Sequence, residues 1–168
     1  VAQVVAEAFQ VDIDRVKITA TSTGKVPNTS ATAASSGSDI NGMAALAACD
    51  TIKGRLVDFA AEHWGVPAAQ IEFLPGFVRV GNQKVAFAEF VNAAYMARVS
   101  LSSTGFYKTP KIHWDRKAGK GRPFYYYSYG AAACEAVVDT LTGEYRVERV
   151  DILHDCGSSL NPALDLGQ

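Results

Sequence analysis

Apolar residues recur at three- and four-residue spacing between Leu46 and Phe59, and this spacing predicts a long amphipathic helix. Ser38 or Asp39 is suited to the N-cap position, because a short polar side chain can accept a hydrogen bond from the first turn. We expect the helix to end near Trp64, with Gly65 as a left-handed cap. The first half of this helix is rich in glycine and alanine, so its backbone can pack very close to a neighbouring segment.

Shorter patterns predict the elements around this helix. Residues 2–9 and 88–98 each carry an apolar helical face, the second one formed by Phe87, Val91, Ala94 and Tyr95. Alternation of apolar and polar residues, or a short apolar run, predicts strands at 16–20, 71–73, 77–80 and 84–86. Residues 101–122 contain six of the basic residues and are expected to form a solvated loop.

The last part of the chain predicts a long β-hairpin. Residues 124–139 and 145–155 read as its strands, and Gly143 between them can adopt the positive φ that a tight turn requires. The apolar phase of the second strand shifts between Val147 and Val150, and either a β-bulge or burial of both faces would explain this shift. Helices and strands follow one another without βαβ regularity, so we expect an α+β fold with a long C-terminal hairpin.

Composition narrows the class of protein. The chain has 168 residues, of which 48% are hydrophobic and 20% charged, and its formal net charge is −1. Such a chain can form a core, and its charge gives no reason to expect nucleic acid or an anionic membrane as a partner. No apolar run approaches the ~20 residues of a membrane-spanning helix, and residues 1–10 do not resemble a signal peptide. Three widely spaced cysteines indicate buried thiols in a reducing cytoplasm.

Metal or nucleophile chemistry has little support in the sequence. No cysteine or histidine pattern has the spacing of a metal site. The run His154-Asp155-Cys156 cannot converge on one point, because adjacent strand residues face opposite sides of a sheet. We therefore expect no metal ligands in the chain.

The segment from Gly24 to Ser38 is the best candidate for a binding site. It is rich in small and hydroxylated residues and runs directly into the N-terminus of the long helix, where free N–H groups and the helix dipole favour an anion. Its natural donors are Thr32, Ser35, Ser36 and Ser38. A loop that only caps the helix is an equally good reading of the residues, and the two interpretations stay open at this level.

Three strings of residues resemble the xanthine dehydrogenase family. The first runs from Lys25 to Ser35 (KVPNTSATAAS) and continues through Asp39 to Asn41-Gly42; the second is Thr104–Pro110 (TGFYKTP); the third is Gly157–Gln168 (GSSLNPALDLGQ). They occur in the family's order and at compatible spacing. The chain is therefore identified as a fragment, residues 1–168, of the molybdopterin-binding domain of such an enzyme. It starts without methionine and stops inside a motif, so both ends read as truncated.

The resemblance implies which residues hold the molybdenum cofactor. One wall of the cofactor site would be formed by a contiguous run, and a single residue would hydrogen-bond the pterin from the opposite side. The cofactor-binding residues are then Thr32, Ala33, Ala34, Ser35 and Gln168, and Ala31 would line the substrate channel. Ala33 and Ala34 would be nearest the metal and the substrate.

The resemblance also implies what this chain lacks. In the family, the catalytic glutamate lies downstream of residue 168, and a Gly-Gln-Gly cofactor loop lies upstream of residue 1. We expect the remaining segments of the molybdopterin subunit, and an iron–sulfur and FAD subunit or domain, as partners. The complete assembly would hydroxylate purines such as hypoxanthine and xanthine with oxygen from water, in the cytoplasm and away from membranes and nucleic acid. The 168 residues alone are expected to be inactive.

Other functions remain as alternatives. The chain could belong to an aldehyde-oxidase-type molybdenum hydroxylase. It could be a non-catalytic module whose Ser/Thr loop holds a generic phosphate ligand. It could also be a structural domain with no ligand.

Overall fold

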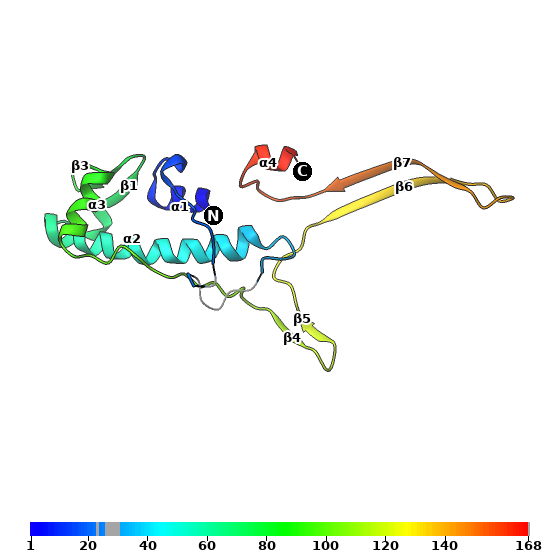
Figure 1. The fold of residues 1–168 in the computed structure, drawn as a ribbon, viewed down its shortest axis with the longest axis horizontal. Coiled ribbons are helices and arrows are strands. Elements are labelled where there is room, and N and C mark those ends of the chain that lie inside the picture. Colours follow the sequence, from blue (N-terminus) through cyan, green and yellow to red (C-terminus); the bar gives the residue numbers. More distant parts are fainter. Residues whose placement is uncertain (23, 26–30, 168) are drawn as a thin grey trace. The chain divides into compact units, whose positions relative to one another are not determined.

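The computed structural model describes residues 1–22, 24–25 and 31–167 (Figure 1). The chain forms two compact units, Val1–Thr109 and the segment from Pro110 onward. Both contain antiparallel strands and helices, which confirms the expected α+β class. No helix in the described part of the chain is long and apolar enough to cross a bilayer.

The longest element is helix α2, Gly42–Trp64, which the apolar spacing predicted (Figure 1). Gly65 ends it in the left-handed conformation, with φ 65°, as expected. The prediction for its start was wrong. One turn of π-helix, η2 (Gly37–Asn41), precedes α2, so Ser38 and Asp39 lie inside a helical turn, and the N-cap position belongs to Ser36.

A three-stranded antiparallel sheet packs against α2 in the first unit. Its strands are β1 (Ile71–Leu74), β2 (Phe77–Val80) and β3 (Gln83–Ala86), in the order β1-β2-β3, preceded by the short 3-10 helix η3 (Ala68–Gln70). Helix α3 (Phe87–Met96) follows β3 directly. These elements agree with the prediction. The core that they share consists of Leu56, Ala60, Phe73, Val78, Val80, Phe90 and Ala94.

Aromatic side chains tie the core together around Phe90. Its ring stacks on Trp64 at a centroid distance of 5.8 Å and meets Phe73 edge-on at 6.0 Å. On the predicted face of α3, Ala94 is buried and Phe87 and Val91 pack against the core, as expected. Tyr95 is exposed instead, and the prediction missed Phe90, which is fully buried. The apolar stripe of a helix can be wider than the part that its neighbours cover, so a residue at the edge of the stripe can remain exposed.

Helix α1, Ala2–Phe9, lies along α2, where a Cβ on Gly42 would meet Val4 at 3.7 Å. It ends at Gln10 in the left-handed conformation, and the 3-10 helix η1 (Ile13–Arg15) follows. The strand expected at 16–20 is not found among the described residues. Alternation alone does not make a strand, because a strand needs a neighbouring strand to accept its backbone hydrogen bonds.

The second unit begins with a short hairpin that the sequence did not predict. Strands β4 (His113–Asp115) and β5 (Lys120–Arg122) pair within the segment expected to be a loop. The carboxylate of Asp115 closes their turn by accepting hydrogen bonds from the N–H groups of Lys117 and Ala118, at 2.8 and 3.1 Å. The basic side chains here are exposed, as expected.

The long hairpin consists of β6 (Gly130–Val138) and β7 (Tyr145–His154). Gly143 has φ 78°, as the turn required. Ala136 pairs with Val147 and Glu135 pairs with Arg149, so Glu148 is an extra residue in β7. The apolar phase shift is therefore explained by a β-bulge. The strand starts six residues later than the predicted 124, and the short helix α4 (Pro162–Gly167) begins at Pro162.

Candidate functional site

A tight turn at residues 33–36 stands before the π-helical turn that leads into α2. The N–H of Ser36 donates to the carbonyl oxygen of Ala33 at 3.4 Å, and the Ser36 hydroxyl donates to the same oxygen at 2.7 Å. The two central residues, Ala34 and Ser35, both have φ 55°. This is the mirror-image turn that normally requires glycine or asparagine.

Two consecutive non-glycine residues in the left-handed region are unusual. Each costs roughly 1 kcal/mol or more, because the Cβ crowds the neighbouring carbonyl oxygen. Such a conformation persists where the surrounding chain holds it, and it is enriched at ligand sites. The turn is open to solvent, since Ala33, Ala34 and Ser35 are all exposed.

A side-chain hydrogen bond ties this turn to the helix. Nδ2 of Asn41 donates to Oγ1 of Thr32 at 3.1 Å. Gly37 lies between them in the chain, and a Cβ there would meet the methyl group of Thr32 at 4.0 Å. Residues 32–41 therefore form one closed loop, and Thr32 serves to hold its shape.

The surface of this loop offers donors and little steric bulk. Among the described residues, neither the Ser35 hydroxyl nor the peptide N–H groups of Ala34 and Ser35 donate a hydrogen bond. The alanine side chains leave the backbone open to a flat ligand at close range. The arrangement can donate hydrogen bonds to the edge or the phosphate of such a ligand next to a helix N-terminus.

The structure brings most of the predicted site residues together. Thr32, Ala33, Ala34 and Ser35 form the exposed turn, and Ala31 precedes it, also exposed. Gln168 and residues 26–30 of the first motif lie outside the described residues. The left-handed pair at Ala34 and Ser35 was not foreseen, because alanine and serine carry no sequence signal for positive φ.

The second motif shapes the surroundings of α2. A Cβ added at Gly105 would lie 1.8 Å from the carbonyl oxygen of Ala44 and 2.8 Å from the amide nitrogen of Ala48. Only glycine allows this approach. Nη1 of Arg55 donates to the carbonyl oxygens of Ser100 and Ser102, at 3.2 and 2.9 Å, and holds the same segment on the helix. The prediction that the glycine- and alanine-rich half of α2 packs unusually close to a neighbour is confirmed.

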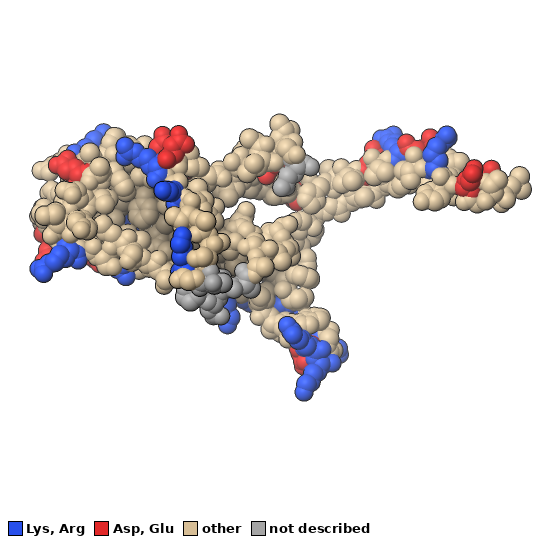
Figure 2. All heavy atoms as spheres, viewed as in Figure 1, with Lys and Arg blue, Asp and Glu red and all other residues tan. Residues whose placement is uncertain are grey.

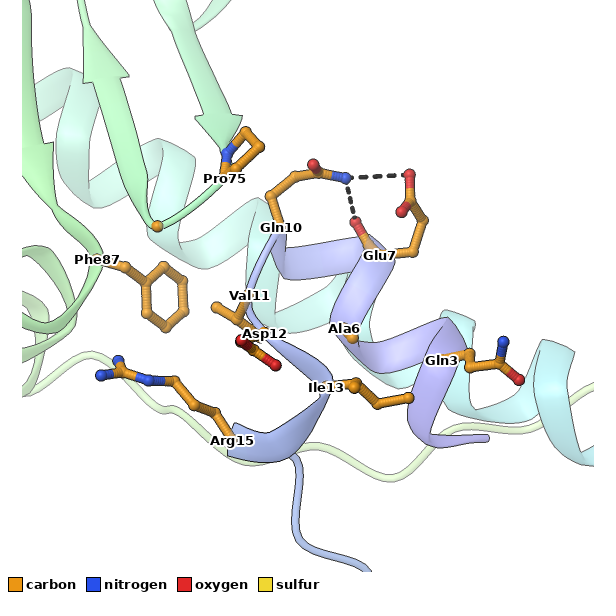
Figure 3. A pocket seen from close by; sticks show the side chains of 11 residues that line it. Gln3, Ala6, Glu7, Gln10, Val11, Asp12, Ile13, Arg15, Pro75 and Phe87 are labelled. Atoms are coloured by element: carbon orange, nitrogen blue, oxygen red, sulfur yellow. Dashed lines mark hydrogen bonds between the residues drawn. The ribbon is translucent and has the colours of Figure 1, made fainter. Parts of the chain in front are cut away.

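A separate cavity of about 750 Å³ opens beside α1 (Figure 3). Its walls come from α1, η1, the β1–β2 turn and Phe87. Two of the polar side chains that line it already form hydrogen bonds with neighbouring residues. Nε2 of Gln10 donates to Glu7, and the carboxylate of Asp12 accepts from the N–H of Asp14 at 3.0 Å. None of residues 31–36 lines it, so this cavity is not the candidate site.

The three cysteines differ in their burial. Cys49 is buried, as predicted, and its burial, with the nearby Asp50 carboxylate, raises the pKa of its thiol. Cys134 and Cys156 are exposed within residues 110–167, so their own unit does not bury these two thiols as expected. Within residues 1–22, 24–25 and 31–167, no three His, Cys, Asp or Glu side chains gather as metal ligands would.

Comparisons with known proteins cover the whole chain. The model of one protein family, the molybdopterin cofactor-binding domain, matches residues 1–168. A xanthine dehydrogenase of Oryza sativa subsp. japonica is 45% identical over 168 residues, and a xanthine dehydrogenase/oxidase of Felis catus is 43% identical over 166. These matches cover 100% and 99% of this chain and 11% of each relative, so the chain spans about a tenth of their length.

The fold also resembles that of a solved protein. A crystal structure of a Cu,Mo-CO dehydrogenase superposes with a TM-score of 0.71 at 23% identity. The match covers 99% of this chain and 20% of that one. The likeness includes both units.

Proposed function

Because the chain belongs to the molybdopterin cofactor-binding domain family, we propose that its loop 31–36 forms one wall of the molybdenum-cofactor site in a xanthine dehydrogenase-type hydroxylase. The observation that carries this proposal is the exposed turn at Ala34 and Ser35, held in the left-handed region directly before a helix. A loop that only capped the helix would not need this conformation. The family match favours a ligand over a purely structural role.

The chemistry of the donor set fits the cofactor. Molybdopterin presents ring nitrogen, carbonyl and phosphate acceptors on a flat body. The turn offers hydroxyl and peptide N–H donors without bulky side chains, and the helix that follows adds a positive dipole end. When bound, the cofactor supplies the redox-active metal at which a substrate carbon is hydroxylated with oxygen from water.

We assign the residues of this wall as follows. Ser35 donates a hydrogen bond from its hydroxyl, and Thr32 holds the loop through Asn41. Ala33 and Ala34 keep the space in front of the metal open. Ala31 lines the substrate channel, and Gln168 binds the pterin from the other side. Their common effect is to fix the orientation of the cofactor.

The activity belongs to a larger assembly. The relatives are about nine times as long as this chain, so we infer that further segments supply the catalytic base, the [2Fe–2S] clusters and FAD. We propose a purine such as hypoxanthine or xanthine as the substrate and a role in purine metabolism in the cytoplasm; the names of the relatives support xanthine. On this proposal the 168 residues alone do not turn over substrate.

Metal analysis tests this function. The chain and the full gene product are each purified from a host that makes the cofactor, and molybdenum, pterin and xanthine oxidation are measured. We expect cofactor and activity in the full protein and neither activity nor tight cofactor binding in the 168 residues. A folded full protein without molybdenum would refute the proposal. Xanthine oxidation by the 168 residues alone would refute the proposal that other segments supply the rest of the active site.

A further inference from the structure

The pairing register of β6 and β7 separates the hairpin into two unlike faces. Directly opposed residues of an antiparallel pair point to the same side of the sheet. Cys134 opposes Val150, Ala132 opposes Ile152, and beyond the bulge Ala136 opposes Val147 and Val138 opposes Tyr145. One side of the hairpin, here called the apolar face, therefore consists of Ala132, Cys134, Ala136, Val138, Tyr145, Val147, Val150 and Ile152. Gly130 and His154 lie at the open end of this face.

The opposite side carries the charges, together with the apolar residues Ala131, Val137 and Leu153. Glu135 opposes Arg149 and Ala133 opposes Asp151 on this charged face. Nε of Arg149 pairs with the carboxylate of Asp151 at 2.7 Å, and Nε of Arg146 donates to Glu148 at 2.8 Å. Figure 2 shows the charged side chains of the hairpin gathered along one of its sides, with uncharged atoms along the other.

The β-bulge keeps most of the apolar residues of β7 on one face and its charged residues on the other. Val147 and Val150 are three positions apart, so in a regular strand they would point to opposite sides. The extra residue, Glu148, restores the phase and takes its own side chain to the charged face, where it meets Arg146. A free hairpin would have no need of such a correction.

Nothing in the described part of the second unit, residues 110–167, covers the apolar face. Val138 on this face is 57% exposed, and its neighbour Val137 on the charged face is 51% exposed, so the two sides are equally open there. A two-stranded hairpin is marginally stable in water and needs a further layer on its apolar side. The face is therefore an interaction surface.

The size of the face argues against a second copy as its partner. Two strands of about nine residues, about 4.8 Å apart, present roughly 300 Å². A stable interface between separate molecules needs about 800 Å² from each partner. A segment of the same polypeptide can cover so small a surface, because no translational freedom is lost. The relatives carry such polypeptide, since this chain spans 11% of their length.

We propose that the apolar face of the β6–β7 hairpin docks onto an apolar layer supplied by the same polypeptide from outside residues 1–168, while the charged face stays in water. This inference does not rest on the cofactor site. It requires only that the chain works within a longer protein.

Thiol labelling in the full gene product tests the exposure of the two faces. Native Cys134 lies on the apolar face, and the swap Ala133→Cys with Cys134→Ala moves the thiol to the adjacent position on the charged face. Alkylation by iodoacetamide is followed by mass spectrometry of the 130–146 region. We expect Cys134 to react roughly tenfold or more slowly than the swapped thiol, because it reacts only after local opening. Equal rates at the two positions, fast or slow, would overturn the proposal.

Photo-crosslinking in the full gene product identifies what covers the face. Tyr145→p-benzoylphenylalanine places the probe on the apolar face, and Arg146→p-benzoylphenylalanine places it on the charged face as the control. We expect the first probe to link within one polypeptide to a peptide outside residues 1–168, and the second to give no such link. A cross-linked dimer, or a link to residues 1–109, would overturn the proposal.

Discussion

Gly105 lies directly on the backbone of α2, so that a Cβ there would come within 1.8 Å of the carbonyl oxygen of Ala44. The amide nitrogen of Ala48 would be only 2.8 Å away. Both obstacles are backbone atoms of a helix, which cannot rotate aside as a side chain can. The segment that contains Gly105 and the helix that follows the candidate cofactor loop are thereby fixed to one another.

Gly105→Ala should destabilise the chain by about 3 kcal/mol, because either the helix or the segment has to move to admit the methyl group. Urea-induced unfolding followed by circular dichroism measures the effect. Gly54→Ala is the matched control. Gly54 lies in α2, the helix that Gly105 contacts, and an added Cβ there would have nothing within 4 Å. That substitution should raise stability by about 0.5–1 kcal/mol. Equal effects at the two glycines would contradict the close approach.

Ser35→Ala in the full protein should lower molybdenum content while leaving the thermal unfolding temperature nearly unchanged, because its hydroxyl is exposed and bonds to no described residue. Ser36→Ala is the comparison. The Ser36 hydroxyl holds the turn through Ala33, so its loss should cost about 1 kcal/mol of stability. Molybdenum is measured by elemental analysis of both variants. An unchanged metal content in Ser35→Ala would remove Ser35 from the site.

Ala34→Phe should abolish xanthine oxidation in the full protein, because a large side chain would fill the space in front of the metal. Ala34→Gly should retain activity, since glycine adopts φ 55° without strain. Turnover and cofactor content are both measured. Full activity of the phenylalanine variant would show that Ala34 does not face the reacting centre.

Two single-residue deletions in β7 should have very different effects on the stability of the full protein. Deleting Glu148 leaves Val147 opposite Ala136 and makes the ladder regular, so the apolar face is kept. Deleting Val147 makes the same regular ladder but puts Glu148 on the apolar face. In the full protein, the first deletion should change stability by less than about 1 kcal/mol, whereas the second buries a charge and should cost about 3 kcal/mol or more. Thermal unfolding compares them, and equal losses would argue against a covered face.

The turn of the long hairpin should weaken in acid. The N–H groups of Leu141 and Thr142 donate to the carboxylate of Asp139 and hold its pKa below the ordinary value. A carboxyl group with a lowered pKa in the folded state stabilises that state above its unfolded pKa of about 3.9, and the effect is lost as the pH falls through the lowered value. Hydrogen-exchange protection of the Leu141 amide between pH 5 and 2 reports this loss, and Asp139→Asn should remove its pH dependence.

Most of the fold follows from local patterns. The end of α2 at Gly65, the three strands β1–β3 and the phase shift in β7 were all visible in the sequence, because each depends on residues close together in the chain. The failures depended on tertiary context. Residues 16–20 alternate like a strand but have no neighbouring strand among the described residues, whereas Lys120–Arg122 has no strand pattern and pairs because Asp115 closes a turn.

The candidate site was predictable in position but not in conformation. The residue types in 31–36 indicated donors at a helix N-terminus, and the resemblance to a family selected the ligand. Neither could indicate that Ala34 and Ser35 take positive φ, since both residues avoid it in isolation. The position of Ser38 inside the π-turn was likewise hidden, because a π-turn and a capped helix start read alike in sequence.

The bulged hairpin also has a consequence for the order of events during synthesis. Only six residues separate β6 from β7, so the two strands can pair within microseconds once both have left the ribosome. Translation adds about 5–20 residues each second, so the paired strands precede by seconds any layer encoded later. During that interval the row of arginine–carboxylate pairs keeps one side hydrated, and the uncovered side is the part of the nascent chain that a chaperone would need to shield.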